Sequence, residues 1–247
     1  MIKPLKRANL PTGKCSAVCA DLDLASIAKL NALGIDVISP IRNKELPVSM
    51  QKHADLLACY CGDGVILLDY SQLQNEKILT EMGFDVRIIS KAVGKSYPND
   101  VYLNACLFDD IAIINTNTIC EELLAICQSR NIIGVKQGYS KCAIAVISKS
   151  AIITDDIGID AMAKSKNIDS LLISKGDVYL EGFEYGFFGG CCGMISQELL
   201  AINGSLDYHR DSNIIKDFLD KYNVCVLELN NSRLKDIGSI IPLVEKA

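Results

Sequence analysis

Cysteine is the side chain in this sequence that most readily does covalent chemistry, and the 247-residue chain has eleven of them. A thiol attacks carbon as the thiolate, so a reactive cysteine needs a cationic neighbour that lowers its pKa. Protonated His53, one of only two histidines, and Lys141 could act in this way. A carboxylate such as Asp55 or Asp100 could pair with a cationic group through two parallel hydrogen bonds. These residue types allow nucleophilic chemistry at a cysteine.

The motifs of the common cofactors and metals are missing. The chain has no GxxxxGK[ST], GxSxG, HExxH or GxGxxG sequence, and no CxxC pair. With only two histidines beside these cysteines, a structural zinc site is not expected. We therefore predict no cofactor and no metal.

Composition and charge exclude several classes of protein. The chain is 49% hydrophobic and 22% charged, with a formal net charge of −5 and no basic stretch beyond Lys3–Arg7. Phosphate neutralisation needs a concentrated basic face, so no nucleic-acid partner is expected. No apolar stretch reaches transmembrane or signal-peptide length. We therefore predict a cytoplasmic protein whose cysteines are mostly or all free thiols.

A helical stretch, a Gly or Asn, and a β-rich stretch recur five times along the chain. Glycine and asparagine tolerate the left-handed conformation that ends a helix, so each copy predicts a helix end followed by a strand. The average spacing is about 47 residues. The five positions are Gly34, Gly83, Asn131, Asn167 and Asn223. Asp155 and Asp156 are expected to cap the fourth of these helices.

A hairpin of two short apolar strands precedes four of these helices. The predicted first strands are Leu56–Cys61, Leu103–Phe108, Cys142–Ile147 and Cys191–Ser196. The first unit has only one such strand, Cys15–Ala20, and a spare strand, Gly238–Val244, stands at the end of the chain. A strand missing at one end and left over at the other predicts ring closure, which removes exposed sheet edges. The expected fold is α/β: strand–strand–helix–strand units in a ring, in a single domain over residues 1–247.

This architecture resembles the guanidine-modifying-enzyme fold, also called the pentein α/β-propeller. That fold includes arginine deiminase, agmatine deiminase, dimethylarginine hydrolase, the amidinotransferases and a non-catalytic ribosome anti-association factor. Four segments look like those of an uncharacterised bacterial family with this fold: Tyr97–Asp100, Gln137–Cys142, Ile153–Gly158 and Gly189–Cys192. The resemblance covers nearly the whole chain.

The resemblance implies a cysteine in a late repeat that attacks a guanidinium carbon, a histidine that moves protons and carboxylates that hold the guanidinium. The late cysteine would be Cys191 or Cys192. The pair His53-x-Asp55 is similar to the His-x-Asp of the deiminases, but it stands in an earlier repeat.

Strand alternation selects among these candidates. Side chains on a strand alternate between two faces, and in such a propeller the start of each first strand lines the central pocket. The polar set contains His53, Asp55, Asp100, Asn104, Tyr139, Lys141 and Cys192. The opposite set is apolar and is expected to pack: Cys15, Leu56, Leu103, Cys142 and Cys191. We therefore predict Cys192, His53 and Asp55 as catalytic, and Asp100, Asn104, Tyr139 and Lys141 as substrate-binding.

Two functions remain open at this point. The first is a Cys-dependent hydrolase or transferase of a guanidino or related small amine compound. The second is a non-catalytic pentein that binds a small ligand or a protein partner, since the fold does not dictate function. Lys14 and Lys141 are expected in the central pocket, where positive charge would favour an anionic group such as a substrate carboxylate. No membrane partner is expected, and a homodimer is left open.

Overall fold

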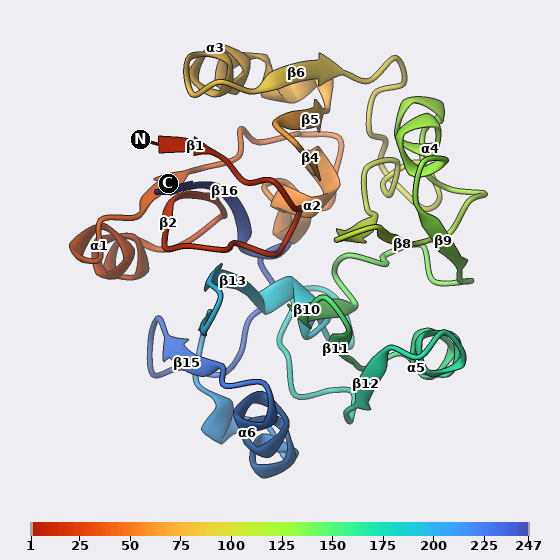
Figure 1. Ribbon diagram of the computed structural model, residues 1–247. Helices are drawn as coiled ribbons and strands as arrows, with labels where there is room; N and C mark the ends of the chain where they lie inside the picture. The colour runs from red at the N-terminus through yellow and green to blue at the C-terminus, as the bar shows by residue number, and fades with distance from the viewer. Residues whose placement is uncertain (1, 247) are drawn as a thin grey trace.

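The computed structural model describes residues 2–246 and contains five small sheets arranged in a ring around a central axis (Figure 1). In four units an antiparallel hairpin is followed by a helix and by a third strand that pairs in parallel with the second. The ring of strand–strand–helix–strand units predicted from the sequence is confirmed.

These four units follow one another along the chain. The second unit is β4 (Ala58–Gly62), β5 (Val65–Leu68), α3 (Leu73–Glu81) and β6 (Asp85–Ile88). The third is β7 (Cys106–Phe108), β8 (Ile111–Ile114), α4 (Glu121–Cys127) and β9 (Asn131–Gly134). The fourth is β10 (Ile144–Ser148), β11 (Ala151–Thr154), α5 (Ile157–Ser165) and β12 (Asp169–Leu172). The fifth is β13 (Cys192–Ser196), β14 (Leu199–Ile202), α6 (Ser212–Lys221) and β15 (Cys225–Glu228).

The first unit is completed by the end of the chain. It contains β1 (Ile2–Pro4), β2 (Cys15–Cys19), α1 (Leu24–Ala32) and β3 (Asp36–Ile38). The last strand, β16 (Ile241–Lys246), lies between β1 and β2 and is antiparallel to both. The prediction that the C-terminal strand closes the ring is confirmed, although the strand begins at Ile241 and not at Gly238.

Left-handed residues end most of the helices as predicted. Gly34, Gly83, Asn167 and Asn223 have φ angles of 73°, 92°, 59° and 55°. The prediction for Asn131 is wrong, because it is the first residue of β9 and its side-chain amide donates to the Asp110 carboxylate over 2.6 Å. Asp156 caps α5 by accepting from the Ile159 amide, as expected, but Asp155 does not.

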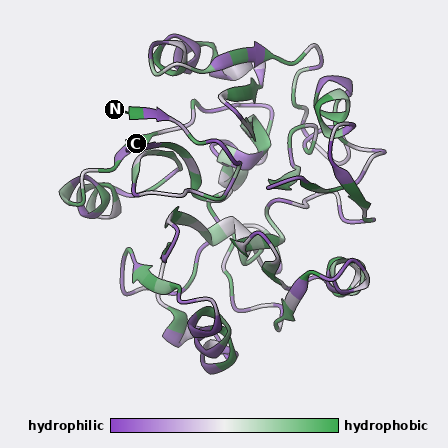
Figure 2. Ribbon diagram, viewed as in Figure 1, coloured by the Kyte–Doolittle hydropathy of each residue, from purple (hydrophilic) through white to green (hydrophobic). Residues whose placement is uncertain are grey.

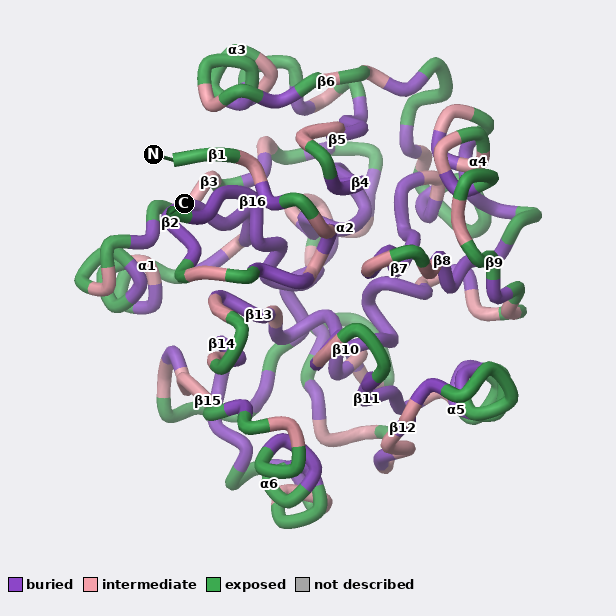
Figure 3. The backbone as a smooth tube through the Cα atoms, viewed as in Figure 1, coloured by how far each residue is buried: buried purple, intermediate pink, exposed green. Residues whose placement is uncertain are grey.

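The core lies around the axis, and the five helices that belong to the repeat units cover the outside of the ring (Figure 1). Figure 3 shows buried backbone at the centre and exposed backbone on the outer helices, and Figure 2 shows hydrophobic residues along the inner strands. Helix α6 buries Ile215, Phe218 and Leu219 on one side. A three-stranded sheet is only marginally stable alone, so packing around the axis supplies the stability of each unit. No helix within residues 2–246 has the length and apolar character that crossing a bilayer requires.

The chain enters the first strands through helical turns, and this differs from the prediction. Helix α2 (Ala54–Leu57) leads into β4, a turn over residues 140–143 leads into β10, and the 3-10 turn Gly189–Cys191 leads into β13. The predicted strands began too early at these places. Alternation of faces does not apply in a helical turn, because its side chains are spaced at about 100° and not 180°.

Candidate active site

One cysteine, one histidine and one aspartate converge where the first strands begin. The Cys142 thiol donates to Oδ2 of Asp55 over 3.0 Å. His53 joins them, with nitrogen, oxygen and sulfur atoms of the three residues all within 4.8 Å of one another. All three side chains are buried. These N, O and S donors are also of the types that bind zinc, a set that the sequence did not predict.

Backbone contacts place His53 and Asp55. His53 is the residue before α2, and Asp55 lies in its first turn. The Asp55 amide donates to the carbonyl of Gly238 over 3.0 Å. Gly238 has a φ of 71°, and a Cβ there would lie 2.4 Å from Cα of His53. Glycine is therefore required where the segment before β16 passes over the histidine.

Asn104 joins the two parts of the site. Its amide nitrogen donates to the Asp55 carbonyl over 3.2 Å and lies 3.3 Å from Sγ of Cys142. Its side-chain oxygen accepts from the Lys141 amide over 2.7 Å. Asn104 is fully buried, so these bonds replace its contacts with water. This predicted substrate-binding residue positions the turn that carries Cys142.

A buried cation partly balances Asp55. The ammonium of Lys141 donates to the hydroxyl of Ser239 over 3.0 Å, and that hydroxyl lies 2.7 Å from Oδ2 of Asp55. Ser239 also lies 2.9 Å from the carbonyl of Gly189. The chain Lys141–Ser239–Asp55 thus links three segments of the ring. Lys141 therefore stabilises the buried carboxylate of Asp55 through Ser239.

Asp236 is a second buried carboxylate at the site, and the sequence analysis missed it. Its Oδ1 lies 3.8 Å from Nδ1 of His53, and it accepts from the amides of Phe187 and Gly238, each over 2.9 Å. A Cβ on Gly190 would lie 2.2 Å from Oδ1 of Asp236. Asp236 stands in an irregular segment between β15 and β16, outside the repeat, so the repeat pattern gave no signal for it.

Burial and the two nearby carboxyl groups keep the Cys142 thiol protonated. Burial, together with Asp55 and Asp236, raises the pKa of Cys142 well above its ordinary value. Burial lowers the pKa of His53 and raises the pKa of Asp55. Burial raises the pKa of Asp236 to about 6. The unliganded site therefore holds a protonated thiol near two carboxyl groups.

The site opens into a cavity of about 240 Å³. Hydrophobic and aromatic side chains form most of its wall. The lining residues are Met50, His53, Tyr139, Cys142, Leu180, Phe183, Glu184, Tyr185, Phe187 and Asp236. Tyr139 donates its hydroxyl to Asp100 over 2.6 Å, and its ring centroid lies 6.0 Å from that of Phe187. Asp100 therefore fixes the orientation of one aromatic wall.

The structure brings most of the predicted site residues together, but not Cys192. The thiol of Cys192, like that of Cys191, lies at the carbonyl of Phe188, and its side chain packs in a hydrophobic cluster with Met194. Cys192 does not line the cavity. Its predicted role stays a prediction that labelling can test.

The prediction that Cys142 packs on the apolar face is wrong. Cys142 precedes β10 in a turn, where strand alternation does not hold, and its thiol meets Asp55. Neither predicted lysine lines this cavity, because Lys14 is exposed and Lys141 bonds Ser239. The substrate-binding role of Lys141 stays a prediction. The signal available in the sequence was the polar segment Gln137–Lys141 directly before Cys142.

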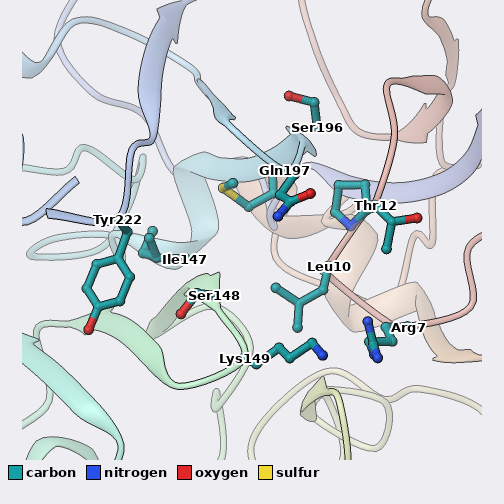
Figure 4. Close-up of a pocket in the computed structure, with 11 residues that line it drawn as sticks. Arg7, Leu10, Thr12, Ile147, Ser148, Lys149, Ser196, Gln197 and Tyr222 are labelled. Atoms are coloured by element: carbon teal, nitrogen blue, oxygen red, sulfur yellow. The ribbon is translucent and has the colours of Figure 1, made fainter. Parts of the chain in front are cut away.

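A second hollow of about 290 Å³ lies between the N-terminal segment and the hairpin turns of the fourth and fifth units (Figure 4). Arg7, Lys149 and Tyr222 are among its lining residues. Arg7 is paired with Asp109 over 2.5 Å, and the hollow is lined by no cysteine or histidine. The smaller cavity at Cys142 is therefore the candidate active site.

A family model matches residues 18–241 of this chain. The chain belongs to the family of unknown function DUF6873. No curated protein matches the sequence.

Solved structures establish the fold. An inosamine-phosphate amidinotransferase from Streptomyces griseus superposes with a TM-score of 0.59 at 11% identity, covering 97% of this chain and 96% of that one. An agmatine deiminase from C. jejuni gives 0.57 at 10% identity, covering 95% and 94%. A dimethylarginine dimethylaminohydrolase gives 0.54 at 10% identity, covering 87% and 93%. The chain has the pentein fold that these hydrolases and transferases share, which confirms the resemblance noted in the sequence.

Proposed function

We propose that this protein is a Cys-dependent hydrolase or transferase of a small organic cation of the guanidine or amine class, with Cys142 as nucleophile. One observation carries the proposal: the thiol of Cys142, the imidazole of His53 and the carboxylate of Asp236 line one aromatic cavity. The pentein fold shared with guanidine-modifying enzymes supports the same reaction class.

The charges of the cavity favour a cation. Asp236 is buried, and no lysine or arginine lines the cavity beside it. A second carboxylate, Asp55, accepts a hydrogen bond from the Cys142 thiol. The charge of Lys141 acts on Asp236, but Lys141 bonds Ser239, so a cation bound in the cavity would supply the direct partner that this buried carboxylate lacks. The rings of Tyr139 and Phe187 offer cation–π contacts. A guanidinium or ammonium group supplies both interactions.

The bound cation would also activate the thiol. Its positive charge lowers the pKa of Cys142, and Asp55 accepts the proton along the existing S–H···O hydrogen bond. With a guanidinium substrate the thiolate bonds to the central carbon as the C–N bond to the departing amine breaks, and His53 passes the proton taken up by Asp55 to that amine. Water completes a hydrolysis, or an acceptor amine completes a transfer, and either step releases the thiol.

Incubation of the protein with a panel of guanidino compounds tests this proposal, with release of ammonia or amine as the readout. We expect turnover that Cys142→Ser abolishes and that Cys192→Ser leaves within about twofold of the unsubstituted protein. Loss of turnover in Cys192→Ser with retention in Cys142→Ser would contradict the assignment and favour the late cysteine.

The second candidate function is binding without catalysis. It is favoured by the raised pKa of Cys142 and by the hydrogen bond that the protonated thiol donates to Asp55. In that case the same cations would bind, no product would form, and Cys142→Ser would leave their affinity unchanged.

A further inference from the structure

One segment of the chain supplies half of the cavity wall. Residues 174–187 connect β12 to the 3-10 turn Gly189–Cys191. They contribute Leu180, Phe183, Glu184, Tyr185 and Phe187 to the lining. We call residues 174–187 the rim segment. The bridge between Tyr179 and Lys235, and the bond from the Phe187 amide to Asp236, anchor it to the segment before β16.

The charged side chains that line the cavity are carboxylates. Glu184 of the rim segment lines it as an exposed side chain, and Asp236, from the segment before β16, lines it as a buried one. Three lysines lie near the cavity without lining it: Lys141 bonds Ser239, Lys175 lies 5.8 Å from the centroid of the Tyr185 ring, and Lys235 is exposed. No lysine or arginine of residues 2–246 lines this cavity.

We propose that the rim segment makes the cavity selective for organic cations that carry no carboxylate. This inference rests on the proposed function and names the substrate class within it: decarboxylated amines and guanidines, in contrast to the corresponding α-amino acids. A carboxylate entering between Glu184 and Asp236 would lose water without gaining a cationic partner. An amino or apolar end meets the ring of Phe183 and the Glu184 carboxylate instead.

Matched pairs that differ only by a carboxylate test the inference: agmatine with arginine, cadaverine with lysine, and putrescine with ornithine. Their affinities are measured by isothermal titration calorimetry at pH 8, where Asp236 is ionised because its pKa is raised only to about 6. We expect the decarboxylated member of at least one pair to bind about tenfold or more tightly than its amino acid.

Two matched variants assign the selectivity to the rim segment. Glu184→Gln should weaken diamine binding by about two- to fivefold, the range for a charge pair near solvent. Glu181→Gln removes an exposed carboxylate from the same segment, outside the lining, and should leave affinity unchanged. Equal effects of the two substitutions would overturn the assignment to Glu184.

The outcomes separate this inference from the proposed function. If both members of every binding pair bind equally, or the amino acids bind better, the inference is overturned while the cation proposal stands. If no amine or guanidine binds in any pair, the proposed function fails and takes the inference with it.

Discussion

The thiol of Cys142 donates a hydrogen bond to the carboxylate of Asp55 over 3.0 Å, although 87 residues separate them in the sequence. Four segments hold this contact: α2, the turn before β10, the loop carrying Asn104 and the segment before β16. A thiol in such a contact is protonated until another charge enters the site. The contact therefore sets both the reactivity of the cysteine and its dependence on a bound cation.

Removing the charge of Asp55 should make Cys142 more reactive in the unliganded protein. Asp55 is the second largest cause of the raised pKa of this thiol, after burial. We expect Asp55→Asn to increase the rate of iodoacetamide labelling at Cys142 by about tenfold at pH 8, because removing this negative charge favours the thiolate. Asp100→Asn is the control, since Asp100 bonds Tyr139 and not the thiol. Slower labelling in Asp55→Asn would contradict the role given to its charge.

Loss of the buried cation should destabilise the fold. Lys141→Met leaves Asp55 and Ser239 without the ammonium that links them, and should lower the free energy of unfolding by about 3–5 kcal/mol. Exposed Lys149→Met should change it by less than about 0.5 kcal/mol. Adding Asp55→Asn to Lys141→Met should recover part of the loss. Urea unfolding measures all of these, and an unchanged stability in Lys141→Met would contradict the buried charge pairing.

Two glycines at the site should not tolerate a methyl group. Gly190→Ala would place Cβ 2.2 Å from Oδ1 of Asp236, and Gly238→Ala would place it 2.4 Å from Cα of His53. We expect each to cost about 1–3 kcal/mol of stability. Gly134→Ala is the control, because nothing lies within 4 Å of its added Cβ, and should stay within about 0.5 kcal/mol. Equal stabilities of the three variants in thermal unfolding would refute this packing.

The contribution of Asp155 and Asp236 to the free energy of unfolding should fall as the pH rises from about 4 to about 7. Burial raises the pKa of Asp155 to about 7 and that of Asp236 to about 6, so the folded state binds more protons than the unfolded state in this interval. The contribution of each protonated carboxyl is present at low pH and is lost as pH rises through its folded pKa. Asp155→Asn should make the free energy of unfolding depend less on pH in this interval. If the free energies of unfolding of Asp155→Asn and the unsubstituted protein differ by the same amount at every pH, the role given to Asp155 is contradicted.

The sequence predicted the fold better than the chemistry. The left-handed residues Gly34, Gly83, Asn167 and Asn223 and the spare strand are local signals, and local signals were enough to give the ring. The prediction failed at Cys142 because β10 begins only at Ile144, so Cys142 lies in a helical turn, where the alternation of strand faces does not apply.

Asp236 and the rim segment could not be predicted for a different reason. They lie in irregular segments that have no periodicity, and their approach to His53 and Cys142 depends on ring closure. Only tertiary packing brings them to the site. The sequence showed the two histidines and the polar segment before Cys142. Their spacing along the chain did not show that Cys142 contacts Asp55 or that His53 approaches Asp236.

Labelling of the native protein with 2-chloroacetamidine, compared with its neutral isostere chloroacetamide, tests the central claim most directly. The amidinium should enter the cavity beside Asp236, lower the pKa of Cys142 and be attacked by its thiolate. Peptide mapping should show Cys142 modified about tenfold or more faster by the cation than by the neutral reagent, and His53→Ala should reduce this rate. Equal rates for the two reagents, or first modification at Cys192, would contradict the account.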